Sequence, residues 1–231
     1  MSDLNGEDDV YKQIEVLREM KASGVVMETN EDALKKIEKL QKSLQVFIPN
    51  KYGPPPYKVE LCIEFPLSML EDNNEFPYST LTIQLAPIEK VPYTVFYFLE
   101  YMLPSFIGGN FKRNAPHVLQ AKLEMNKNIK PFAFQEYNRD YTHTEFTIGF
   151  AGRPSNAEHI YISTRDNTRN HGPGSQGSKT EADCILGKLI GKYDIDVVKR
   201  MRTQPGNSPK NGFVHDSSNF IFIERMRLIS E

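Results

Sequence analysis

Several residue types that commonly carry enzyme chemistry occur in this chain, and their spacing argues against the mechanisms that use them. The histidines at 143, 159, 171 and 215 do not follow the spacing of metal ligands, and no Cys-x-x-Cys motif accompanies them. The glycine-rich segment 172–179 lacks the G-x-x-x-x-G-K-[ST] pattern of a phosphate-binding loop. No serine, histidine and aspartate are placed as a triad. We therefore expect no metal, no cofactor and a chemistry that needs neither.

Composition and charge are those of an ordinary globular protein. The 231 residues are 39% hydrophobic and 25% charged, which suits one large domain or a medium domain with an appendage. The net charge of -2 indicates no nucleic-acid partner. We expect no membrane insertion, because apolar runs are short, and no signal peptide, because the first residues are acidic. Cys62 and Cys184 read as free thiols, which favours a soluble, cytoplasmic protein.

The elements that would position a site are mostly short strands. The predicted strands are segments that are rich in β-branched and aromatic residues, or in which apolar and polar residues alternate. Strand patterns fall at residues 57–65, 79–85, 145–152, 158–166 and 220–229. Helical patterns fall at residues 92–102 and 194–200.

The first fifty residues have helical periodicity instead. Asn30 is a suitable N-cap for the second of two helices. Its apolar side chains repeat in steps of four and three, the spacing of a coiled-coil seam, at Ala33, Ile37, Leu40, Leu44 and Phe47. Two interpretations stay open. Residues 1–50 form a helical hairpin packed on the rest of the chain, or a short coiled coil through which residues 8–47 self-associate.

A proline-rich segment separates these helices from the strands. Pro49 predicts the end of the second helix, and three consecutive prolines make residues 51–56 a stiff linker. We expect the domain boundary there. Residues 57–231 would then be one domain that folds without residues 1–50.

Short motifs in this second domain follow one another in a recognisable order. Residues 81–85, the V-P-x-T turn at 91–94 and Phe98 form a strand, a turn and a helix with an inward phenylalanine. Residues 111–116 match an F-H-R-x-x-P strand and turn, with lysine in place of histidine. In this order the motifs resemble the cyclophilin-type peptidyl-prolyl isomerases. The resemblance implies a mainly β fold: an eight-stranded antiparallel β-barrel capped by two helices, preceded here by the N-terminal helical segment.

The resemblance also implies a chemistry. Rotation about an X-Pro bond has a barrier of ~18–20 kcal/mol, which falls when a donor approaches the proline nitrogen and an apolar pocket holds the ring. In the family an arginine is that donor, and Arg113 stands at the matching position. Arg113 is therefore the implied catalytic residue, and proline-containing peptides or proteins are the implied partners.

The remaining groove positions depart from the family pattern. The matching residues are Leu119, Gln120, Phe150, Ala151, Tyr161, His171 and Leu186. Gln120 comes one residue early, which turns a strand side chain to the opposite face unless a bulge absorbs the shift. Tyr161 would place a hydroxyl in an apolar floor, and the chain has no tryptophan. Two functions stay open: a weak isomerase, or a non-catalytic peptide- or protein-binding module in a larger assembly.

Overall fold

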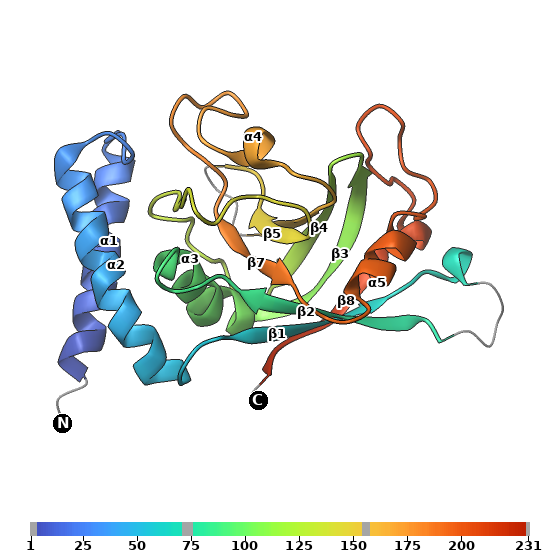
Figure 1. Cartoon of the computed structure of the whole chain (residues 1–231), viewed down its shortest axis with the longest axis horizontal. Coiled ribbons are helices and arrows are strands. Elements are labelled where there is room, and N and C mark those ends of the chain that lie inside the picture. The colour runs from blue at the N-terminus through green and yellow to red at the C-terminus, as the bar shows by residue number, and fades with distance from the viewer. Residues whose placement is uncertain (1–3, 71–75, 154–157, 230–231) are drawn as a thin grey trace.

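The computed structural model describes residues 4–70, 76–153 and 158–229, and at its centre is a closed barrel of antiparallel strands (Figure 1). The order around the barrel is β1-β2-β7-β5-β6-β4-β3-β8. The strands are β1 (Lys58–Glu64), β2 (Tyr78–Leu85), β3 (Phe106–Ala115), β4 (Val118–Met125), β5 (Thr147–Phe150), β6 (His159–Ser163), β7 (Ile185–Leu189) and β8 (Ile221–Ile229). The predicted eight-stranded antiparallel barrel is confirmed.

Alternation along the strands explains why the barrel closes around an apolar core. In β1 every second residue is buried, and Leu61 of β1 lies opposite Leu81 of β2, which is also buried. Both neighbours of every described strand are strands of the same barrel, so the barrel has no edge strand among the described residues.

Helices cover the barrel at separate places. The predicted helix 92–102 is present as α3 (Pro92–Tyr97), which continues as a π-helical turn, η2 (Phe98–Met102), and a 3-10 turn, η3 (Leu103–Ser105). Figure 1 shows α5 (Asp194–Met201) on the other side of the barrel from α3. Three short elements, η1 (Leu67–Met69), α4 (Thr168–His171) and η4 (Ser217–Asn219), lie in the connections. Within the described ranges, no helix has both the length and the apolar character that crossing a membrane would require.

The N-terminal helices form a hairpin packed on the barrel beside α3 (Figure 1). Helix α1 spans Leu4–Ala22 and α2 spans Glu31–Tyr52, with the Asn30 side chain accepting a hydrogen bond from the Ala33 amide. The ring of Phe47 contacts Phe96 of α3 edge-on, with 5.8 Å between centroids. The predicted seam is therefore turned toward the rest of this chain. Self-association through residues 8–47 stays a prediction.

Pro49 does not end α2, contrary to the expectation. The helix continues to Tyr52 and stops at Gly53, whose φ of 85° is the left-handed conformation that glycine adopts without strain. A proline costs the helix one hydrogen bond. The side chains of the last turn bind Glu100, which pairs with Lys51 at 2.9 Å and accepts a hydrogen bond from the Tyr52 hydroxyl. Only residues 53–56 remain as a connection.

The hydrophobic core crosses the predicted domain boundary. Leu17 and Leu44 of the hairpin belong to the same buried cluster as Ile63 and Ile83 of the barrel. A hairpin that shares the core contributes to the stability of the barrel, because its removal would expose apolar surface to water. Independent folding of residues 57–231 stays a prediction, and this shared core is an argument against it.

Candidate functional site

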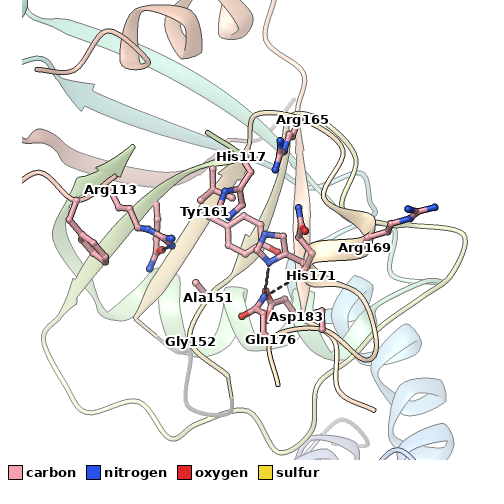
Figure 2. Close-up of a pocket in the computed structure, with 15 residues that line it drawn as sticks. Arg113, His117, Ala151, Gly152, Tyr161, Arg165, Arg169, His171, Gln176 and Asp183 are labelled. Atoms are coloured by element: carbon pink, nitrogen blue, oxygen red, sulfur yellow. Dashed lines mark hydrogen bonds and ion pairs between the residues drawn. The ribbon is translucent and has the colours of Figure 1, made fainter. Parts of the chain in front are cut away.

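A pocket of about 710 Å³ opens on the barrel wall formed by β3, β4 and β6 and by the segment around α4. Its lining includes Arg113, Gln120, Ala151, Tyr161 and His171, all of which the sequence had indicated (Figure 2). A volume of this size is within the range of pockets that hold small ligands or short peptide segments. The pocket is thus the candidate functional site.

Arg113 is held at one side of the pocket by three contacts. Its Nη1 donates to Gln120 Oε1 at 2.8 Å, and its Nε donates to the Asn211 carbonyl at 3.0 Å. The guanidinium carbon lies 5.3 Å from the centre of the Phe213 ring, within cation–π distance. Partial burial lowers the pKa of Arg113 from its usual value, but guanidinium stays charged in proteins. Its remaining N–H groups have no acceptor among the described residues and are available to a ligand.

A β-bulge brings Gln120 to the pocket face. The pairing of β3 with β4 shifts between Phe111, which lies opposite Ala121, and Arg113, which lies opposite Gln120. Lys112 is the extra residue, so the one-residue displacement of Gln120 is absorbed. Gln120 therefore lines the pocket and does not point to the opposite face of the strand.

Tyr161 forms the floor of the pocket with its ring, while its hydroxyl points into the protein. The Tyr161 hydroxyl lies 3.0 Å from His143 Nδ1, and His143 Nε2 lies 3.0 Å from the Asp183 carbonyl. Because a carbonyl only accepts, Nε2 carries the proton and Nδ1 accepts from the hydroxyl. Burial lowers the pKa of His143 to about 4 and raises that of Tyr161, so both groups are neutral. The Tyr161 hydroxyl, which the sequence placed in an apolar floor, is therefore hydrogen-bonded to the buried His143.

A glycine makes room for this arrangement. A Cβ at Gly149 would overlap the Tyr161 hydroxyl and the ring carbon that carries it. Glycine inside a strand is a signal for close approach by another group. A glycine inside the strand pattern at residues 145–152 is visible in the sequence. The sequence does not show that the side chain close to this glycine is Tyr161.

His171 is fixed against Tyr161 by a buried carboxylate. The two rings stack with centroids 4.3 Å apart, and His171 Nδ1 lies 2.6 Å from Asp183 Oδ2. Asp183 Oδ1 forms an ion pair with Arg153 Nε at 2.7 Å, although both side chains are almost fully buried. Gln176 adds a hydrogen bond to Asp183 Oδ2 at 2.9 Å. Sequence analysis missed Arg153 and Asp183, since nothing in the sequence paired them.

Three predicted groove residues lie elsewhere, which corrects their expected place. Leu119, Phe150 and Leu186 are buried in the barrel core and do not line the pocket. Strand alternation is the reason in β4, where Val118 and Gln120 face the pocket and the residue between them faces the core.

The closeness of several histidines does not make a metal site. The ring of His171 lies 5.6 Å from that of His143 and 6.0 Å from that of His117. Among the described residues, no group of three or more His, Cys, Asp or Glu side chains is arranged to hold a metal ion. His143 is committed on both nitrogens, and His171 is committed on Nδ1. These rings serve packing and hydrogen bonding.

The pocket combines hydrogen-bond donors with apolar surface. Arg113 supplies the donors, and Val118, Ala151, Phe213 and the face of Tyr161 supply the apolar contacts. No protein-family profile matches the chain, and no curated protein sequence matches it. Inference about function therefore rests on the pocket itself.

Proposed function

We propose that this pocket binds proline-containing segments of peptides or proteins and catalyses X-Pro isomerisation weakly, in the manner that the resemblance to cyclophilins implies. The observation that carries the proposal is Arg113. Its guanidinium is oriented by Gln120 and Asn211, and it keeps free N–H groups beside an apolar surface.

The chemistry needs only these two features. A donor near the proline nitrogen withdraws its lone pair from amide resonance, which lowers the barrier to rotation. A donor that is already oriented loses little entropy when the substrate binds, and it acts most strongly where water is partly excluded. Arg113 is half-buried and is hydrogen-bonded on two nitrogens, which satisfies both conditions.

The apolar surface is smaller than the sequence suggested, and this supports weak activity. Val118, Ala151 and Phe213 line the pocket, whereas Leu119 and Leu186 are in the core. Each missing apolar contact of about 1.4 kcal/mol lowers transition-state binding about tenfold. The same observation favours a second candidate, a pocket that holds a proline-containing segment without turning it over.

The test is an isomerisation assay by two-dimensional NMR exchange on short X-Pro peptides, with binding measured in parallel. We expect slow catalysis by the intact protein and a loss of about 10²–10³-fold, down to background, in Arg113→Ala. Arg139→Ala is the matched control, because Arg139 is exposed and does not line the pocket.

Each outcome separates the two candidates. Equal activity in the intact protein and in Arg113→Ala would remove the catalytic assignment. Binding that depends on Arg113, without catalysis, would leave the binding module. If no proline-containing peptide bound at any concentration up to millimolar, both candidates would be rejected.

A further inference from the structure

We propose that the pocket selects anionic sequences: a carboxylate or phosphate on a residue next to the proline binds at the end of the pocket formed by Arg165 and His117. The inference rests on the proposed function and names its substrate class. It comes from a charge imbalance in the pocket lining.

The cations of the lining outnumber its available anions. Arg113, Arg165 and Arg169 line the pocket, and the acidic residue that lines it with them is Asp183. The Asp183 side chain is 1% exposed and already pairs with Arg153 and His171. The Asp183 carboxylate is therefore already paired with buried side chains and does not pair with the arginines on the pocket surface.

Of the arginines, Arg165 is the one free to meet a ligand at this end. Arg169 points away from the pocket in Figure 2, and its charge contributes to the lowered pKa of exposed Asp166. Arg165 is exposed and has no ion-pair or hydrogen-bond partner among the described side chains. An arginine in this state can bind a carboxylate or a phosphate through two parallel hydrogen bonds.

Backbone hydrogen bonds hold Arg165 next to His117. The Thr164 amide donates to the His117 carbonyl at 3.0 Å, and the Asn167 side-chain amide donates to the same carbonyl at 2.8 Å. Residues 164–167 are thus tied to the start of β4, with Arg165 between the two tied positions. Figure 2 shows its side chain beside His117 at the edge of the pocket.

His117 experiences the positive charge of this region. Burial, together with the nearby charges of His171, Arg113, Arg165 and Arg202, lowers its pKa to about 4. A neutral imidazole here can still donate one hydrogen bond to an anion. An anionic group bound at Arg165 would reverse the electrostatic part of this shift.

The test compares proline peptides that differ by one side chain. Fluorescein-labelled peptides carry phosphoserine, glutamate or glutamine immediately before or after the proline, and binding is measured by fluorescence anisotropy. At low salt we expect glutamate to bind about tenfold more tightly than glutamine, and phosphoserine more tightly still, because phosphate carries more charge. Which anion gains more identifies whether the natural ligand is acidic or phosphorylated.

Matched variants locate the effect. Arg165→Gln should remove the preference, so that the anionic peptides bind no more tightly than the glutamine peptide. Arg139→Gln makes the same change of net charge outside the pocket and should keep the preference. In NMR titrations of the intact protein, saturating phosphopeptide should raise the His117 pKa, whereas the glutamine peptide should not.

The outcomes also separate this inference from the proposed function. Equal affinity across the peptide series, or a preference that survives in Arg165→Gln, would overturn the inference even if the neutral peptide is isomerised. Anionic peptides that bind through Arg165 equally well with alanine in place of proline would keep the anion site and overturn the proline function.

Discussion

Two buried carboxylates have different kinds of partner: Asp183 in the pocket wall and Glu136 between the hairpin and the barrel. Asp183 and Glu136 are 0% and 2% exposed. They lie near each other, because Cys184 follows Asp183 and its Sγ accepts a hydrogen bond from the Glu136 amide at 3.2 Å. Asp183 has the cationic partner Arg153. Glu136 receives hydrogen bonds from neutral groups only: the amides of Tyr93 and Thr94, the Thr94 hydroxyl and the Gln41 side chain.

Because its partners differ, Glu136 makes the stability of the hairpin junction depend on pH. Burial raises the pKa of Glu136 to about 7, because neutral donors do not offset the cost of removing its charge from water. Gln41, one of its donors, belongs to α2, so this carboxylate connects the hairpin to the barrel. The pocket wall keeps a fixed ion pair, while the junction with the hairpin contains a group that titrates near neutral pH.

The largest expected effect comes from breaking the pocket-wall pair. Asp183→Asn removes the partner of Arg153, whose side chain is 5% exposed and would keep its charge in the interior. We expect the free energy of unfolding to fall by about 3–5 kcal/mol, measured by urea denaturation. Asp140→Asn is the control, because its pair with Lys90 is exposed and its loss should change stability within experimental error. A loss as small as that of the control would show that the buried pair is not the distinguishing feature.

The next effect is a pH dependence at the hairpin junction. Because the folded pKa of Glu136 is raised to about 7, the folded state holds a proton that the unfolded state has released. Stability from this group is therefore complete below about pH 4.3 and is lost as the pH rises through 7, by up to about 3 kcal/mol. His143 and His117, whose folded pKa values are lowered to about 4, add stability over much of the same range as the pH rises. Urea denaturation between pH 5 and 8 should therefore show the decline in the intact protein relative to Glu136→Gln, which lacks this carboxyl group.

Glu136→Gln sharpens that test, since it should abolish the decline. The loss of stability at acid pH should remain in this variant, because His143 has a folded pKa of about 4 and is neutral in the folded state. Stability from His143 is lost as the pH falls from about 6.5 toward 4. An alkaline decline that persists in Glu136→Gln would assign it to another group.

A smaller effect is expected at the pocket floor. Tyr161→Phe leaves His143 Nδ1 buried without its donor, which should cost about 1–3 kcal/mol of unfolding free energy. Tyr193→Phe is the matched control, because Tyr193 is 64% exposed, and it should change stability within experimental error. Thermal unfolding followed by circular dichroism measures both, and equal midpoints would show that the hydroxyl is not needed.

The smallest effect should come from the charged contact at the end of the hairpin. Glu100 accepts hydrogen bonds from Tyr11 at 2.7 Å and from Tyr52, and it pairs with Lys51. Glu100→Gln keeps an acceptor but loses the charge, so we expect about 1 kcal/mol in urea denaturation. Glu38→Gln breaks an exposed pair within α2 and should change stability within experimental error. If both variants lose the same amount, Glu100 contributes no more than a surface pair.

Local rules carried the sequence predictions that succeeded. Alternation placed the strands, and the Asn30 side chain caps α2 as its residue type predicts. Each of these depends on neighbours within a few residues, which the sequence displays directly. Arg113, Ala151 and Tyr161, which only the resemblance to a family brought together, line one pocket, and their role stays a prediction.

Tertiary contacts decided the rest. Pro49 lies inside α2, and the last turn of that helix binds Glu100, which is far away in the sequence. Gln120 faces the pocket because a bulge at Lys112 shifts the register, and Leu119, Phe150 and Leu186 face the core because of the face each strand turns inward.

What the sequence determined by itself was the position and order of most of the strands and helices. What only the tertiary structure decided was how the polar residues are paired. Arg153 and Asp183 are thirty positions apart, and His143 meets Tyr161 across the barrel wall. Periodicity reports which face of an element is buried, but a buried polar group needs one particular partner, and folding chooses it from the whole chain.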